Sequence, residues 1–202
     1  MVDYSASVSS LPTHSTDAKR QLRRSLLTAR QRIPATLWRE KSDRLCAHLN
    51  AWAEFRQAKT VLAYLSSRQE PDLSLLFSSR QRWGFPRCVE RSLAWHRWSP
   101  AARVPLQIGR YNIPEPPASA PTIAPAEVDL ILVPAVACDA RGYRLGYGGG
   151  FYDRMLSLPE WAAIPTVGIV FECGRLPQVP VDPWDRPLGG VCTEAGLFLP
   201  DA

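Results

Sequence analysis

The chain has 202 residues, of which 46% are hydrophobic and 21% charged. This size and composition are those of a single globular domain, and no apolar run is long enough to span a bilayer. The net charge of +5 is by itself weak evidence for a nucleic-acid partner. The five cysteines are widely spaced without a metal-binding pattern, so we expect reduced thiols in a cytoplasmic protein.

The first predicted helix begins with a cap at Ser15 or Thr16. Its apolar residues recur at helical spacing, and its basic residues, Arg30 among them, occupy the other faces. Pro34 ends this helix and opens a second one, which is predicted to run to about Gln57.

Short β-prone segments alternate with helical ones along the rest of the chain. Asp72 is expected to cap a helix that reaches about Trp83, and another helix is expected over residues 150–158. Residues 99–127 are rich in proline and are predicted to be irregular. Strands are predicted at residues 60–66, 85–89, 93–98, 129–136, 166–171 and 191–199.

This alternation predicts an α/β fold, a single three-layer domain with a mostly parallel mixed sheet flanked by helices. The domain is predicted over residues 17–202, after a polar, serine-rich stretch, residues 1–16, that is expected to form a disordered tail. Ligands in such folds bind beyond the carboxyl ends of the strands.

The most informative segment is RGYRLGYGGGFYDR, residues 141–154, with four glycines within five positions. Such a cluster indicates unusual dihedral angles or a close approach to a ligand, and successive exposed N–H groups bind anions. The loop is therefore predicted to bind phosphate, with Asp153 in the next helix as a Mg²⁺ ligand. It matches neither the Walker A nor the GxGxxG pattern. The alternatives are that the loop is only a surface turn, and that Asp153 only stabilises the N-terminus of the following helix.

Four further residues have both a functional and an ordinary interpretation. Lys19 and Arg23 lie one helical turn apart and present two cations on one face, either for phosphate or for solvent. Glu70 follows a predicted strand, where binding groups concentrate, although a loop glutamate is often only solvated. Tyr111 is able to stack on a flat heterocycle or to pack locally.

Taken together, these residues resemble the 5-formyltetrahydrofolate cyclo-ligase family, also called methenyltetrahydrofolate synthetases. The resemblance implies an enzyme that uses ATP and Mg²⁺ to convert 5-formyltetrahydrofolate into 5,10-methenyltetrahydrofolate, ADP and phosphate through a phosphorylated formyl intermediate. We expect a monomer that binds neither nucleic acid nor membranes. The matching stretches are KRQLRR (19–24), YLSSRQEPD (64–72), YNIPEPP (111–117), DLILVPAVACDARGYRLGYGGGFYDR (129–154) and VPVDPWDRPLGGVCTE (179–194).

Carried over position by position, the resemblance assigns two binding regions and a metal ligand. It gives Lys19 and Arg144 catalytic roles and Asp153 the role of metal ligand. Folate would contact Leu65, Glu70, Tyr111 and Tyr152. ATP would contact Lys19, Arg23, Arg144, Gly146, Tyr147, Gly148, Gly149, Gly150, Phe151 and Tyr152.

One position departs from the family pattern. Gly189 stands where the family usually has a second metal-site carboxylate. A second hypothesis is therefore a weakened paralogue that binds folate or nucleotide without efficient turnover. The basic helix over residues 19–32 motivates a third, a nucleic-acid-binding module, although no recognised nucleic-acid motif is present.

Overall fold

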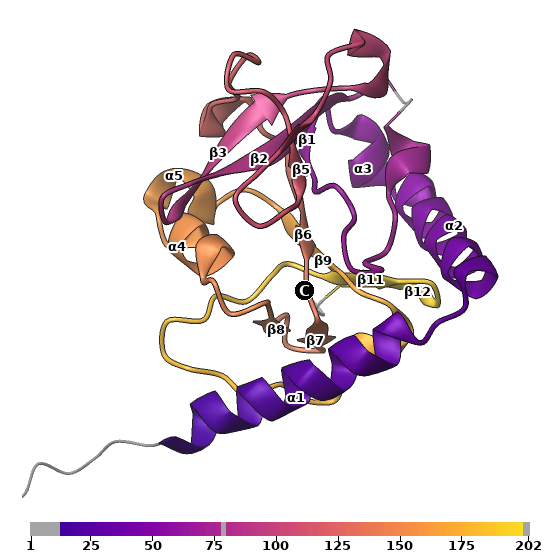
Figure 1. The fold of residues 1–202 in the computed structure, drawn as a ribbon, viewed down its shortest axis with the longest axis vertical. Coiled ribbons are helices and arrows are strands. Elements are labelled where there is room, and N and C mark those ends of the chain that lie inside the picture. The colour runs from indigo at the N-terminus through magenta and orange to yellow at the C-terminus, as the bar shows by residue number, and fades with distance from the viewer. Residues whose placement is uncertain (1–12, 78–79, 200–202) are drawn as a thin grey trace, which may run out of the picture.

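A seven-stranded sheet in the order β12-β11-β9-β6-β1-β2-β3 forms the middle layer of the fold (Figure 1). The computed structural model describes residues 13–77 and 80–199. The inner strands run parallel, and β3 and β12 pair antiparallel at the two edges. The strands are β1 (Thr60–Leu62), β2 (Arg82–Val89), β3 (Ser92–Arg97), β6 (Leu130–Pro134), β9 (Thr166–Ile169), β11 (Val191–Thr193) and β12 (Gly196–Phe198).

The central strand β6 has apolar side chains on both faces, which is why it lies in the middle of a covered sheet. Leu130 and Leu132 pack in one core with α2 (Ala35–Ala51) and α3 (Ala53–Gln57). Ile131 and Val133 pack in the core of the opposite face with α4 (Phe151–Leu156) and α5 (Pro159–Ala162). This confirms the predicted three-layer α/β fold with a mostly parallel sheet.

Helix α1 (Thr13–Gln31) lies apart from these layers, beneath β7 and β8 in Figure 1. Its residues Leu22 and Leu26 pack against the core of a small second sheet. That sheet consists of β7 (Ala137–Asp139), β8 (Arg144–Leu145) and β10 (Arg175–Leu176). Because β7 follows β6 directly, α1 is held near the carboxyl ends of the parallel strands, where the predicted site residues lie.

Two predictions about the first helices were wrong in their boundaries. Helix α1 begins at Thr13, before the expected cap at Ser15 or Thr16, so the expected tail over residues 1–16 is too long. An Asp17–Arg20 ion pair at 2.9 Å supports these early turns, and residues 1–12 lie outside the described part of the chain. The second helix is interrupted at Trp52, whose extended backbone lets its ring pack on the core.

The helix predicted from Asp72 to Trp83 is also wrong. Asp72 does accept a hydrogen bond from the Ser74 amide at 3.0 Å, but only a single 3₁₀ turn follows, Ser74–Leu76, and its N-cap residue is Leu73. Trp83 instead belongs to β2, because Trp83 and Phe85 are both buried in the core shared with α2. The burial of Trp83 and Phe85, two residues apart as on one face of a strand, therefore overrides the local preference for a helix.

The remaining predicted segments are confirmed with adjusted limits. The paired part of the strand predicted over residues 60–66 is only β1, and the segment at 191–199 is the hairpin β11–β12. Residues 99–127 are mostly irregular, with a small hairpin of β4 (Gln107–Ile108) and β5 (Pro114–Glu115). Single 3₁₀ turns lie at Pro100–Ala102, Pro125–Glu127 and Glu172–Gly174. No helix of the described chain is long and apolar enough to cross a membrane.

Candidate active site

The glycine loop adopts the kind of backbone that its composition predicts. Gly148 has φ +98° and Gly150 has φ +64°, in the region that favours glycine. A Cβ at Gly149 would lie 2.8 Å from the Phe151 ring. Gly148 and Gly149 are exposed, and no backbone hydrogen bond within the described residues uses the amides of Gly148, Gly149 or Gly150. The loop therefore presents donor groups to solvent at the start of α4, as an anion site requires.

Two cations from α1 lie against this loop and the segment that follows β10. Arg23 donates from Nε to the Gly146 carbonyl at 2.7 Å, and burial lowers its pKa. Lys19 Nζ forms ion pairs with Asp182, at 2.7 Å, and with Asp185. Burial lowers the pKa of Lys19, but these two carboxylates outweigh it and raise the pKa overall. Both cations are thus turned inward rather than to solvent.

Buried Arg144 forms an ion pair with the partly exposed carboxylate that is predicted to bind metal. Arg144 donates to Asp153 Oδ1 at 2.7 Å and to the Arg186 carbonyl at 2.6 Å. The Arg144 side chain is only 3% exposed, whereas that of Asp153 is 27% exposed. The pair fixes the guanidinium at the first turn of α4, directly after the glycine loop.

Glu70 is nearly fully buried and is hydrogen-bonded to the glycine loop. Its Oε1 accepts from the Tyr147 hydroxyl at 2.7 Å, and its Oε2 accepts from the Ser67 amide at 2.9 Å. Burial raises the pKa of the Glu70 carboxyl, although these hydrogen bonds and the charge of Arg30 act in the opposite direction. The predicted folate-side carboxylate and the predicted phosphate loop are therefore in direct contact.

The aromatic candidates border the same region. Tyr111 is 45% exposed and meets the ring of Phe151 edge to face, with centroids 5.8 Å apart. The Tyr152 hydroxyl is buried without a hydrogen-bond partner in the described residues, and burial raises its pKa. An orphaned buried hydroxyl fits a group whose partner arrives with a ligand. Leu65 packs at the edge of the core near the end of β1.

Sequence reasoning missed Arg30, which is buried rather than solvated. It donates to the Tyr147 hydroxyl and, at 3.2 Å, to the Arg68 carbonyl. The spacing of Lys19, Arg23 and Arg30, four and then seven residues, places all three on one helix face. That spacing was a usable signal, but basic residues also occur on the other faces of the helix.

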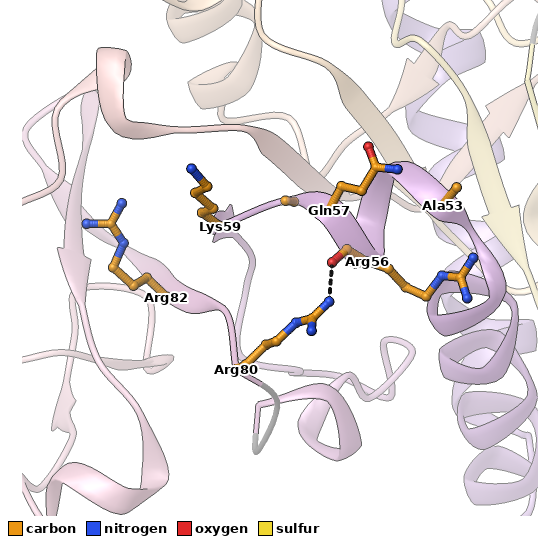
Figure 2. Close-up of a pocket in the computed structure, with 7 residues that line it drawn as sticks. Ala53, Arg56, Gln57, Lys59, Arg80 and Arg82 are labelled. Carbon is orange, nitrogen blue, oxygen red and sulfur yellow. Dashed lines mark hydrogen bonds between the residues drawn. The ribbon is translucent and has the colours of Figure 1, made fainter.

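A basic hollow of about 700 Å³ lies elsewhere, at the amino ends of β1 and β2 (Figure 2). Its cations come from α3 and from the residues that begin these strands. Arg56 and Arg82 point to opposite sides of the hollow, and Arg80 donates to the Arg56 carbonyl at 3.0 Å. The cations do not converge on one point, and none of the predicted site residues lines this hollow.

Comparisons with known proteins give a consistent result. The model of the 5-formyltetrahydrofolate cyclo-ligase family matches residues 15–194. The 5-formyltetrahydrofolate cyclo-ligase of Mycolicibacterium smegmatis is 31% identical over 186 residues, which cover 87% of this chain and 93% of that protein. That of Haemophilus influenzae is 28% identical over 183 residues, covering 86% and 96%. The NMR structure of Aquifex aeolicus 5,10-methenyltetrahydrofolate synthetase superposes with a TM-score of 0.78 at 31% identity, covering 90% of this chain and 92% of that one.

Proposed function

The chain belongs to the 5-formyltetrahydrofolate cyclo-ligase family, and we propose that the region around its glycine loop holds ATP and folate side by side. The enzyme converts 5-formyltetrahydrofolate to 5,10-methenyltetrahydrofolate. The observation that carries the proposal is the contact between Glu70 and Tyr147, because it joins the folate-side carboxylate to the phosphate loop.

The proposed nucleotide side consists of the free loop amides and three cations. The amides of Gly148 to Gly150 make no backbone hydrogen bond within the described residues, Arg23 lies against the Gly146 carbonyl, and Arg144 is fixed at the start of α4. Lys19 would exchange Asp182 and Asp185 for phosphate oxygens when ATP binds. Such preorganised donors act chiefly by positioning the transferred group and neutralising its charge.

The proposed chemistry makes a poor leaving group into a good one. The formyl oxygen of the substrate attacks the γ-phosphorus of ATP, so the P–O bond to ADP breaks and the oxygen is phosphorylated. N10 then attacks the activated carbon, its proton leaves to solvent, and the C–O bond breaks with departure of phosphate. Glu70 would accept hydrogen bonds from the pterin, and Tyr111 with Phe151 would pack on its flat face.

The residues present fit a Mg²⁺ ion that is shared with the nucleotide. Mg²⁺ in such sites takes one or two carboxylates together with phosphate oxygens and waters, and Asp153 supplies one carboxylate. Both hydrogen bonds to the Asp153 carboxylate end on Oδ1. Within the described chain no three His, Cys, Asp or Glu residues form a separate metal cluster. When bound, the ion would neutralise charge on the transferring phosphoryl group.

Mixing the protein with 5-formyltetrahydrofolate, ATP and Mg²⁺ is expected to produce 5,10-methenyltetrahydrofolate, which is followed by its near-ultraviolet absorbance. ADP release measured in the same reaction should match product one to one, because each ring closure consumes one phosphoryl group. Omitting ATP serves as the control. A folded preparation that gives no product would overturn the proposal.

Restoring a carboxylate at position 189 is expected to leave turnover no higher than in the wild type. The Gly189 amide donates to Thr166 Oγ1 at 3.0 Å, at the start of β9, and an added Cβ would lie 3.2 Å from the Thr166 carbonyl. Asp153 is held by Arg144 and the Arg186 amide, and no hydrogen bond in the described residues joins it to Gly189. The kcat of Gly189→Asp and its Mg²⁺ dependence provide the measurement, and a clear rise in kcat would favour the weakened paralogue.

We also propose that the enzyme works in the cytoplasm as a monomer, without nucleic-acid or membrane partners. All five cysteines are free thiols, which fits a reducing compartment. Of the basic residues on α1, Lys19, Arg23 and Arg30 are engaged with the protein. This leaves fewer of them for a nucleic acid than the sequence suggests. Sedimentation at several concentrations tests the oligomeric state.

A further inference from the structure

We propose that Arg30 is a positioning residue for the folate half of the site. Its guanidinium holds Tyr147 and Glu70 in the arrangement that receives the substrate. This inference rests on the proposed function of that site. Arg30 lies on α1, far in the sequence from both partners, and its role follows from where its guanidinium is placed.

The Arg30 guanidinium contacts three separate segments that form the site. It donates to the Tyr147 hydroxyl in the glycine loop and, through Nε, to the Arg68 carbonyl in the loop before Glu70 at 3.2 Å. A longer contact of 3.5 Å reaches the Ala135 carbonyl just beyond β6. The planar fork of an arginine fixes three acceptors in one geometry, which a lysine ammonium on a flexible stem does not.

The loop that carries Glu70 needs such support. Arg68 and Gln69 both have positive φ, +48° and +57°, which is unfavourable for side chains other than glycine. Strained backbone persists only where neighbouring contacts hold it. The Arg30–Arg68 hydrogen bond is one of the contacts that hold this loop, together with the hydrogen bonds from Ser67 and Trp38 to Glu70.

The charge of Arg30 also acts on Glu70. The carboxyl is buried, and the groups that affect its ionisation are Arg30 from α1, Tyr147 from the glycine loop and Ser67 from its own loop. Burial is the main cause of the raised pKa of the Tyr64, Tyr147 and Tyr152 hydroxyls, and the charge of Glu70 raises the pKa of each further. Of the groups that lower the pKa of Glu70, Arg30 alone has a full positive charge, so its loss should make Glu70 harder to ionise.

The test compares Arg30→Gln and Arg30→Lys with Arg24→Gln, an exposed arginine on the same helix. For Arg30→Gln, kcat/KM for 5-formyltetrahydrofolate is expected to fall about 10- to 100-fold, the usual cost of losing a hydrogen bond to a charged group. The KM for ATP should change less than twofold. The acid limb of the pH profile of kcat/KM for folate should move to higher pH. Arg30→Lys should restore the limb but not the full rate, and Arg24→Gln should match the wild type.

A double-mutant cycle with Tyr147→Phe keeps the test decisive even if Arg30→Gln folds poorly. Because Arg30 acts partly through the Tyr147 hydroxyl, Arg30→Lys should cost less in the Tyr147→Phe background than in the wild type. An unmoved acid limb in folded Arg30→Gln, equal losses for folate and ATP, or full additivity in the cycle would overturn the inference. Absence of turnover in the wild type would instead overturn the proposed function.

Discussion

Replacing Arg144 with alanine is expected to lower kcat by about 100- to 1,000-fold, the usual cost of removing one preorganised donor from a reacting group. The side chain is buried and is held by the Asp153 carboxylate and the Arg186 carbonyl, so it is fixed before substrates arrive. Its guanidinium is paired with Asp153 in the first turn of α4, which directly follows the glycine loop, where the transferred phosphoryl group is proposed to lie. Steady-state kinetics with saturating ATP and folate provide the measurement.

Arg144→Lys separates charge from geometry. Lysine keeps the positive charge but cannot reach Asp153 and the Arg186 carbonyl with a planar fork, so an intermediate kcat is expected. Arg24→Ala, an exposed residue of α1, is the matched control and should leave kcat unchanged. If folded Arg144→Ala retained the wild-type kcat, Arg144 would have no part in phosphoryl transfer.

Glu70→Gln is expected to lower kcat/KM for 5-formyltetrahydrofolate by about 100-fold, with little change in the KM for ATP. A buried site that is built to accept hydrogen bonds loses much of its affinity when its acceptor is altered. In Glu70→Gln, donors such as the Ser67 backbone N–H face a side-chain carboxamide instead of a carboxylate. The wild type should also lose activity as the pH falls through the raised pKa of Glu70, because the protonated carboxyl is a weaker acceptor. Glu70→Gln should lack this acid limb.

The matched control is Glu160→Gln, an exposed carboxylate in α5 that takes no part in the proposed site. It should keep both the wild-type rate and the wild-type acid limb. A Glu70→Gln enzyme with the same acid limb as the wild type would assign that limb to another group. Equal losses for ATP and folate would place Glu70 outside the folate half.

The parts of the site that were predictable from the sequence are those encoded locally. Four glycines within five residues predict positive φ angles, which Gly148 and Gly150 have, and residues 129–136, apolar on both faces, predict the covered central strand. Lys19 and Arg23 were found as a pair because helical spacing alone brings them to one face. Such features need no knowledge of distant partners.

The parts that were missed depend on contacts between distant segments. Arg30 is buried because α1 crosses beneath the second sheet and meets Tyr147, which is 117 residues away. The partners of Lys19, Asp182 and Asp185, are more than 160 residues away and belong to an irregular segment. The helix expected after Asp72 failed for the same reason, since the burial of Trp83 and Phe85 is decided by the sheet.

The most direct measurement is a crystal structure of the protein with a non-hydrolysable ATP analogue and Mg²⁺. The terminal phosphate is expected beside the amides of Gly148 to Gly150, within reach of Arg23 and Arg144, with Asp153 near the metal ion. A nucleotide bound elsewhere, such as in the basic hollow lined by Lys59 and Arg82, with the glycine loop empty, would contradict this assignment.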